Sequence, residues 1–193
     1  MAKLSFITGN MHKFKEMNKI FKDKISQYHL KQLNLNPMEI QAESLQEVAR
    51  VKLQSIKDRV KGSFFIEDAG FFVDPPLNGF PGVYSSYVFK TIGYEGILKL
   101  IDDFESSRAY FSSIIALYFK PEKRILFFEG RVDGRVSETP RGSGGFGFDP
   151  IFIPEEIPNK TFAELSIEQK NHISHRGKAL DKLIQYLKKT NEI

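Results

Sequence analysis

Two long apolar segments stand close together in the second half of the chain. Ala109–Phe119 and Arg124–Val132 each have the length and the β-branched and aromatic content of a strand, and only Lys120–Lys123 separates them. A connection this short joins antiparallel neighbours, so the pattern predicts a long β-hairpin. The rest of the chain has to be built against this antiparallel ribbon.

The first third of the chain shows a different pattern, in which strands alternate with helices. Leu4–Ile7 is a short apolar strand, and the apolar residues of 14–21 then recur at helical spacing. A second helix is expected to begin at Ser44, because Ser44–Glu47 has the form of a capping box. Ser63–Ile66 follows as an apolar strand. Alternating elements together with a hairpin predict an α/β fold with a mixed sheet.

Three further predictions complete the secondary structure. Residues 84–104 are expected to form helical pieces broken near Gly93, with Phe71–Val73 as a separate short strand before them. Pro150–Ile153 is expected to be extended, and Ser174 to cap a last helix.

Length, composition and charge limit the classes of protein to which the chain can belong. A chain of 193 residues is expected to form one domain, residues 1–193, and the absence of cysteine excludes disulfides, thiolate metal sites and a cysteine nucleophile. A net charge of +4 from scattered basic residues does not favour nucleic acid, although it suits a small polyanionic substrate. The N-terminus lacks the apolar run of a signal peptide and no segment reaches membrane-spanning length, so we expect no membrane partner and a cytoplasmic location.

The stretch RGSGGFGFDPIF, residues 141–152, matches the spacing G-x-G-x-x-G of dinucleotide-binding loops. Such a loop must open a helix, whereas Asp149–Pro154 contains two prolines and cannot start one. The cofactor interpretation therefore fails. Two other interpretations of this stretch stay open. In the first, Phe146, Phe148 and Asp149 hold a flat ring. In the second, which is the commoner case, the glycines form a turn and the phenylalanines lie in the core.

Thr8–Asn10 lies between a strand and a helix, where free backbone N–H groups suit a phosphate, and Lys13 follows one turn later. An ordinary turn with an asparagine cap explains the same residues equally well.

Glu67 and Asp68 follow the apolar strand 63–66, and consecutive strand residues point to opposite faces, so only one of the pair can face a given cleft. With Glu39 or Glu43 they could hold Mg²⁺, which prefers oxygen ligands. A solvent-exposed acidic turn is the alternative. For Ser174–Arg176, the alternative to a functional role is a helix cap followed by surface charges.

The order of these motifs resembles the inosine/xanthosine triphosphate pyrophosphatase family along essentially the whole chain. The matching segments are Thr8–Glu16, Glu67–Gly70, Phe80–Ser85, Gly145–Pro150 and Ser174–Arg176. The resemblance implies a Mg²⁺-dependent enzyme that converts ITP, dITP and XTP, non-standard purine nucleoside triphosphates, to the monophosphate and pyrophosphate. It also implies an elongated α/β domain of two lobes around a long mixed sheet, an active-site cleft between the lobes, and a homodimer.

The resemblance also assigns residues. It places the triphosphate on Thr8, Gly9, Asn10 and Lys13, the metal on Glu39 and Asp68, and the catalytic base on Asp68. Lys52 and Lys170 would contact phosphate or base, and the base pocket would comprise Phe146, Gly147, Phe148, Asp149, His175 and Arg176. Many relatives carry Ser or Thr where this chain has Ala69, so Ala69 is expected to contact the nucleotide through its backbone only.

Two other functions fit parts of the pattern. A related pyrophosphatase could act on modified pyrimidine or methylated nucleotides. A non-catalytic nucleotide or RNA binder could use the aromatic loop and scattered lysines, and it would show steep salt dependence without Mg²⁺-dependent turnover.

Overall fold

The computed structural model describes residues 2–102 and 107–190. The strands are β1 (Ala2–Ile7), β2 (Tyr28–Leu33), β3 (Phe64–Asp74), β4 (Pro81–Gly82), β5 (Arg108–Phe119), β6 (Arg124–Val136) and β7 (Phe152–Pro154). The α-helices are α1 (Met11–Lys24), α2 (Leu45–Ile56), α3 (Ser85–Thr91), α4 (Gly93–Leu100), α5 (Ile167–Ile173) and α6 (His175–Thr190), with 3₁₀ helices η1 (Lys57–Arg59), η2 (Asp149–Ile151) and η3 (Phe162–Glu164). No helix within these ranges is long and apolar enough to cross a lipid bilayer.

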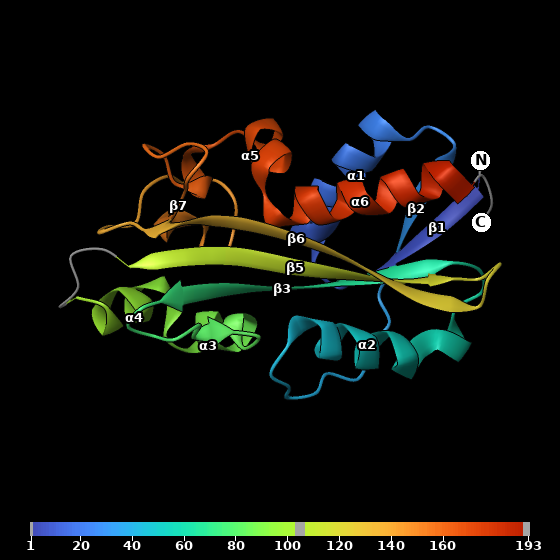
Figure 1. The fold of residues 1–193 in the computed structure, drawn as a ribbon, viewed down its shortest axis with the longest axis horizontal. Helices are drawn as coiled ribbons and strands as arrows, with labels where there is room; N and C mark the ends of the chain where they lie inside the picture. Colours follow the sequence, from blue (N-terminus) through green and yellow to red (C-terminus); the bar gives the residue numbers. More distant parts are fainter. Residues whose placement is uncertain (1, 103–106, 191–193) are drawn as a thin grey trace. The chain divides into compact units, whose positions relative to one another are not determined.

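Within the described residues, seven strands form one mixed sheet in the order β2-β1-β3-β5-β6-β7, with β4 paired to β3 (Figure 1). β1 runs parallel to both β2 and β3, whereas β4 and β7 pair antiparallel with their neighbours. β5 and β6 are the predicted hairpin, joined by the turn at residues 120–123. The α/β class with a mixed sheet is thereby confirmed.

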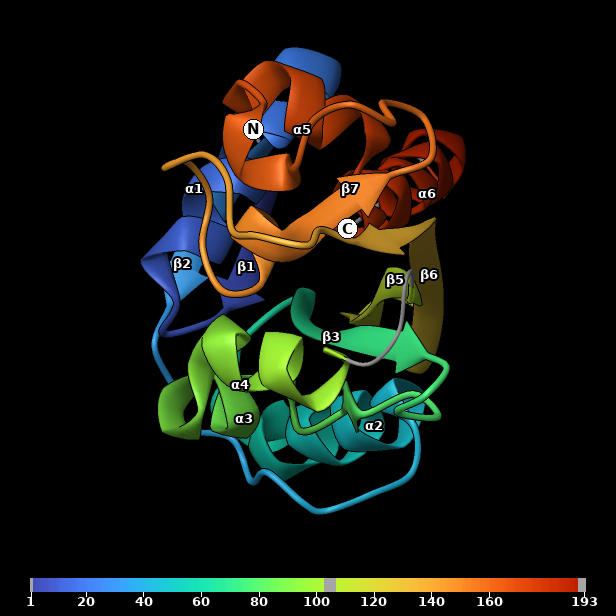
Figure 2. The ribbon, with the colours of Figure 1, turned by 90° about the vertical axis from the view of Figure 1, so that its left-hand side faces the viewer.

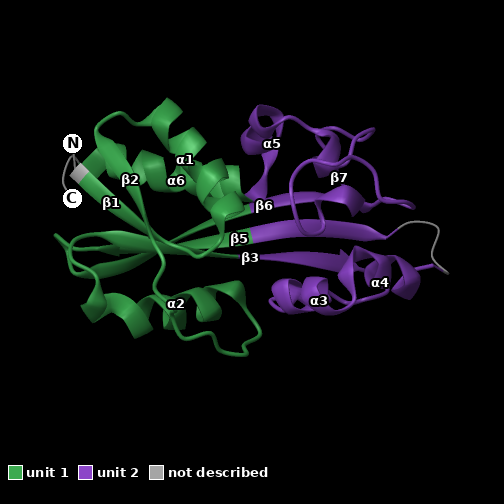
Figure 3. Cartoon of the chain, turned by 180° about the vertical axis from the view of Figure 1, so that it is seen from behind, with its two compact units in different colours: residues 1–68, 113–130, 176–193 green, residues 69–112, 131–175 purple. Residues whose placement is uncertain are grey.

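The chain divides into two compact units, coloured separately in Figure 3. Unit 1 comprises residues 1–68, 113–130 and 176–193, and unit 2 comprises residues 69–112 and 131–175. Each unit has its own hydrophobic core. In unit 1, α1 and α6 lie on one face of the strands and α2 on the other (Figure 1). In unit 2, α3 and α4 lie side by side next to β3 (Figure 2), and Val88 and Ile97 pack into the core with Phe71.

Five phenylalanine rings interact in the core of unit 2. The interacting rings are those of Phe71, Phe111, Phe148, Phe152 and Phe162, with centroids between 4.9 and 6.0 Å apart. Stacked and edge-to-face pairs at these distances add to the stabilisation from burial alone.

The predicted helix caps at Asn10 and Ser44 are confirmed, and α6 begins at His175, directly after the predicted cap Ser174. Asn10 Oδ1 accepts hydrogen bonds from the backbone N–H groups of His12 and Lys13, and Ser44 Oγ accepts from the N–H of Glu47. Each side chain satisfies donors that the first turn of a helix cannot pair internally. The break near Gly93 is also confirmed, since α3 ends and α4 begins there. Residues 103 and 104 of the predicted helical region lie outside the described residues.

The prediction that the strand ends at Glu67 and Asp68, with Phe71–Val73 as a separate strand, is wrong. β3 continues without interruption from Phe64 to Asp74. Two acidic residues in mid-strand normally argue against a buried strand, but here both carboxylates are paired with basic side chains of unit 1. Pairing removes most of the cost of burying the charge.

Among the elements that were not predicted are β2 and α5. β2 was missed although Tyr28 and Leu30 are buried and His29 and Lys31 exposed, which is the alternation of a half-buried strand. α5 was missed although Ser166 and Gln169 form a capping box at its start. The extended segment predicted at Pro150–Ile153 is confirmed for Phe152 and Ile153, which lie in β7, and is wrong for Pro150 and Ile151, which belong to η2.

The motif Phe80–Ser85 has a structural role in unit 2. The Ser85 hydroxyl donates to the Gly82 carbonyl at 2.6 Å and accepts from the Phe71 N–H at 2.8 Å. A Cβ atom at Gly70 would collide with the Gly82 carbonyl oxygen, so the glycine that ends Glu67–Gly70 allows β4 to approach β3.

Candidate active site

Glu67 and Asp68 are held on β3 and engage different partners, as alternation along a strand requires. Glu67 pairs with residues of α1 and α6, and Asp68 pairs with a residue of α2. Figure 1 shows these helices on opposite faces of the strands of unit 1. One strand therefore places two carboxylates among basic side chains of three helices, and the charge of Lys13 acts on both of them.

Glu67 is fully buried and ion-paired on both oxygens. Its Oε2 lies 2.7 Å from Lys13 Nζ, and its Oε1 accepts from Arg176 Nε at 3.2 Å. Burial alone would raise the pKa of Glu67, but Arg176 and Lys13 outweigh it and hold the pKa below its ordinary value. Glu67 is therefore a fixed negative charge in the interior of unit 1.

Arg176 is 3% exposed and lies against two carboxylates. Besides Glu67, it donates from Nη1 to Glu16 Oε2 at 2.6 Å. The resemblance implies a base-pocket role for Arg176, and the structure shows its guanidinium held by two carboxylates of unit 1. Sequence reasoning quoted Glu16 but assigned it no role. Its position four residues before Ile20, which places the two side chains on one face of α1, was the available signal.

Asp68 lies beside a lysine shared with a second carboxylate. Lys52 Nζ donates to Asp68 Oδ2 at 3.0 Å and to Glu39 Oε1 at 2.9 Å. Burial lowers the pKa of Lys52, but its two carboxylates more than offset this and the pKa is raised. Burial also raises the pKa of Asp68, against the opposing effect of Lys13 and Lys52. Glu39, rather than Glu43, is the glutamate held in this group.

At the start of α1 the backbone N–H groups of Asn10, His12 and Lys13 already have partners. The Asn10 N–H donates to Thr8 Oγ1 at 3.1 Å, and Asn10 Oδ1 takes the N–H groups of His12 and Lys13. Gly9 is exposed, and a Cβ there would press on the Asn34 side chain. An anion at this helix end would have to replace the asparagine cap, so the charge of Lys13 is the main attraction for phosphate in this region.

The donor set fits Mg²⁺ in chemistry. The described residues contain no group of three or more histidine, cysteine, aspartate or glutamate side chains that could hold a metal ion. Mg²⁺, however, is commonly bound by one or two carboxylates together with waters and substrate phosphates. Glu39 and Asp68 supply two such carboxylates around one point of positive charge, the Lys52 ammonium.

In unit 2, Asp149 and Lys170 form a buried ion pair at the glycine loop. Lys170 Nζ lies 2.6 Å from Asp149 Oδ2, and both side chains are 5% exposed or less. The same Oδ2 accepts from the Phe146 N–H at 2.7 Å, and Lys170 Nζ sits 5.0 Å from the centre of the Phe146 ring. A cation over an aromatic face is attracted by the ring quadrupole. Phe146, Asp149 and Lys170 thus form one polar-aromatic group.

Gly145 makes this group possible. Its φ is +69°, and a Cβ there would overlap Asp149 Oδ2. We expect Gly145→Ala to lower the free energy of unfolding by about 1–3 kcal/mol through backbone strain and displacement of Asp149. Urea unfolding followed by circular dichroism measures it.

Gly147→Ala is the matched control, because Gly147 has φ +66° but no neighbouring atom lies within 4 Å of the position that a Cβ would occupy. The Gly147→Ala variant is therefore expected to lose only the stability that backbone strain at a positive φ costs. If the two variants lost the same free energy of unfolding, the position of the Asp149 side chain would not depend on Gly145.

The two phenylalanines of the glycine loop differ in burial. Phe148 is 3% exposed and stacks on Phe71 in the core, as the core interpretation required, whereas Phe146 is half-buried. His175 is buried and stacks on Phe111 with ring centroids 4.8 Å apart. Ala69, like Phe146, is partly exposed. Phe146 is therefore the loop ring best placed to meet a ligand.

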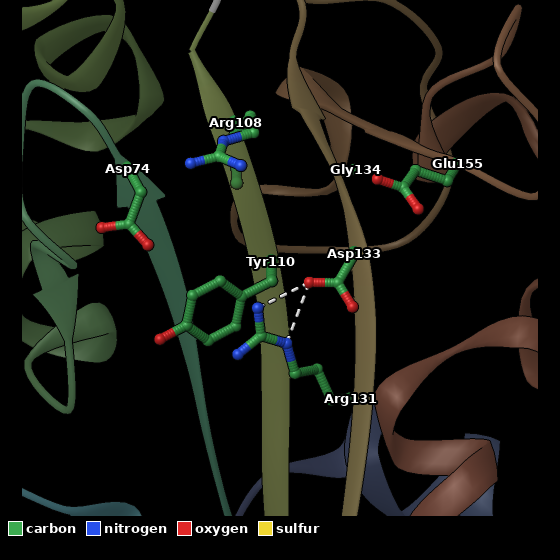
Figure 4. Close-up of a pocket in the computed structure, with 8 residues that line it drawn as sticks. Asp74, Arg108, Tyr110, Arg131, Asp133, Gly134 and Glu155 are labelled. Atoms are coloured by element: carbon green, nitrogen blue, oxygen red, sulfur yellow. Dashed lines mark hydrogen bonds and ion pairs between the residues drawn. The ribbon is translucent and has the colours of Figure 1, made fainter.

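A separate cavity of about 230 Å³ lies in unit 2 (Figure 4). Arg131 stacks on Tyr110, with Cζ 3.6 Å from the ring centre, and bonds Asp133 through Nε and Nη2. Asp74, Arg108 and Glu155 complete the charged lining. The lining includes no residue assigned to the site from the sequence.

Comparison with known proteins gives one consistent result. Residues 4–186 match the Ham1 family. The chain is 50% identical to a dITP/XTP pyrophosphatase of Thermococcus kodakarensis over 186 residues, 96% of this chain and 97% of the relative. It is 47% identical to a dITP/XTP pyrophosphatase of Pyrococcus horikoshii, with the same coverage of both chains.

Solved structures agree on the fold. The Ham1 protein of Staphylococcus aureus superposes with a TM-score of 0.82 at 28% identity, covering 97% of this chain and 99% of that one. A Ham1 protein from Coxiella burnetii gives a TM-score of 0.83 at 27% identity, covering 98% and 100%.

Proposed function

The chain belongs to the Ham1 family, and on that premise we propose that it hydrolyses non-standard purine nucleoside triphosphates, dITP and XTP among them, to the monophosphate and pyrophosphate. The named relatives are dITP/XTP pyrophosphatases that align with nearly the whole chain. The observation in the structure that supports the proposal best is the pair of carboxylates on β3, each set among lysines suited to a polyphosphate.

Unit 1 would supply the hydrolytic groups. Asp68 would accept the proton of the attacking water as a general base. Lys13 would donate to the phosphate oxygens as charge develops on the departing pyrophosphate. Lys52 would balance Asp68 and Glu39 before the substrate arrives.

Glu39 and Asp68 would also hold Mg²⁺. When bound there, the ion would neutralise charge on the triphosphate and polarise a water molecule. The fit of two carboxylates to the ligand preference of Mg²⁺ supports this assignment.

Unit 2 would supply the groups that recognise the base. Phe146 offers a half-buried ring for stacking, and Lys170 offers an ammonium donor held by Asp149. Hypoxanthine and xanthine carry an oxygen acceptor at position 6, whereas adenine carries an amino donor. A buried donor left unpaired against adenine can support discrimination of roughly 10⁴-fold.

A substrate panel tests the proposal. With Mg²⁺ present, dITP and XTP are expected to give monophosphate and pyrophosphate at rates well above those for ATP, for modified pyrimidine triphosphates and for methylated purine triphosphates. Preferred turnover of a pyrimidine or methylated nucleotide would support the alternative pyrophosphatase instead. Binding without turnover of any triphosphate would support a non-catalytic nucleotide binder.

Two other expectations are proposals as well. These are the homodimer that the resemblance implies and the cytoplasmic location expected from the sequence pattern. Analytical ultracentrifugation of the purified chain tests the first.

A further inference from the structure

Four charged side chains form a continuous buried network within unit 1. In spatial order they are Glu16, Arg176, Glu67 and Lys13, and each neighbouring pair is joined at 2.6 to 3.2 Å. The network, called the Glu67 network from here on, connects α1, α6 and β3, which are far apart in the sequence.

Glu67 cannot itself reach a substrate. Its side chain is 0% exposed, and its two oxygens are engaged by different partners, Arg176 and Lys13. Neither proton transfer to a substrate nor phosphate contact is open to such a group. Glu67 can therefore act on the reaction only through the residues that it touches and through the field that its charge exerts on Asp68.

Lys13 is the member of the Glu67 network that can reach an anion. Its side chain is 18% exposed, and its ammonium, which carries three donors, forms an ion pair with Glu67 Oε2 at 2.7 Å. A lysine has a long flexible stem whose freedom must be lost when it binds a phosphate. A fixed carboxylate at 2.7 Å removes that freedom in advance.

Resting on the proposed function, we propose that Glu67 is a positioning residue of the reaction: it fixes the Lys13 ammonium for the substrate's phosphate groups, and Arg176 fixes Glu67. β3 supplies the rigid backbone for this anchor. The carboxylate next to it in the sequence, Asp68, forms its ion pair with Lys52 instead.

A double-mutant cycle with Lys13→Met tests the proposal. Glu67→Gln keeps the shape of the side chain and removes its charge. It is expected to lower kcat/KM for dITP about 10- to 100-fold, the scale of a misplaced catalytic group, and to weaken pyrophosphate binding measured by calorimetry to a similar extent. In the Lys13→Met background the same change is expected to alter both quantities by no more than about twofold. Equal factors in both backgrounds would overturn the proposal.

Glu16→Gln is the matched control. It removes the other carboxylate on Arg176 without touching Lys13, so it is expected to lower the urea midpoint as Glu67→Gln does. Pyrophosphate binding is expected to stay within about twofold of wild type. If Glu16→Gln weakened that binding as much as Glu67→Gln, a general effect on packing would replace the positioning role.

Glu67→Asp covers the case in which Glu67→Gln does not fold. It keeps the charge but shortens the reach to Lys13, and pyrophosphate binding is expected to fall between wild type and Lys13→Met. Wild-type affinity in a folded Glu67→Asp variant would contradict the anchor. Pyrophosphate binding reports on Glu67 and Lys13 independently of turnover. A wild-type chain that binds pyrophosphate but does not hydrolyse dITP would therefore refute the proposed function alone.

Discussion

Asp68→Asn is expected to lower kcat for dITP hydrolysis by about 10²- to 10⁴-fold, the range that a general base contributes. Asparagine has nearly the same shape but cannot accept the proton of water, and it is a poorer ligand for Mg²⁺ than a carboxylate. Pyrophosphate release under saturating dITP measures the effect.

The same substitution is expected not to reduce stability at neutral pH. The pKa of Asp68 is raised by burial, so the folded state binds a proton more readily than the unfolded state. Stability contributed by this group is therefore lost as pH rises from the unfolded pKa through the folded one, and at pH 7 the ionised carboxylate is a cost. Removing the charge removes that cost, while Glu39 continues to pair with Lys52.

Asp133→Asn serves as the matched control for Asp68→Asn. Asp133 is a half-exposed carboxylate of unit 2, ion-paired with Arg131. Its substitution is expected to leave kcat unchanged. Wild-type turnover in Asp68→Asn, or an equal loss in Asp133→Asn, would contradict the assignment of Asp68 as the base.

Arg176→Ala is expected to lower the free energy of unfolding by about 3–5 kcal/mol, the typical cost of removing one partner from a buried ion pair. Two carboxylates, Glu16 and Glu67, would be left in the interior without their shared guanidinium. Urea unfolding of the variant beside wild type measures the loss.

Arg131→Ala provides the comparison for Arg176→Ala. Arg131 also pairs with a carboxylate, but at the surface, where both side chains are about half exposed, and such pairs contribute at most about 1 kcal/mol. If Arg176→Ala were as mild as Arg131→Ala and the preference for dITP over dATP disappeared, Arg176 would be a base-recognition residue after all.

Local rules were sufficient wherever a segment's structure depends on its own residues. The caps at Asn10 and Ser44 and the hairpin turn at residues 120–123 followed from side chains within a few positions. The same rules, applied at Ser166, would have found α5. The α/β class with a mixed sheet followed from adding such segments together.

Long-range pairing decided what local rules could not. The sequence of β3, taken alone, predicts an end at Glu67, because the partners that stabilise these acids, Lys13, Lys52 and Arg176, lie at least 16 positions away in the chain. For the same reason the charges of Ser174–Arg176 looked like surface charges, although His175 and Arg176 are buried. Burial of a charged side chain can be inferred only once its counter-charge is located.

The sequence predicted which residues belong to the candidate site more fully than it predicted the contacts between them. Lys52 came from the family resemblance, and only the structure shows it bound to both Glu39 and Asp68. Phe148 was named beside Phe146, yet one ring is core and the other half-buried, because the glycines between and before them reverse the chain. Glycine φ angles near +66° and +69° are invisible in a sequence without the fold.

The central claim is that this chain cleaves a purine triphosphate to monophosphate and pyrophosphate and selects the 6-oxo base over adenine. One measurement tests it most directly: dITP and dATP at equal concentration in one reaction with Mg²⁺, all products followed by ion-exchange chromatography. We expect dIMP and pyrophosphate to appear in equal amounts while dATP stays intact. Release of inorganic phosphate, or consumption of the two nucleotides at the same rate, would contradict the account.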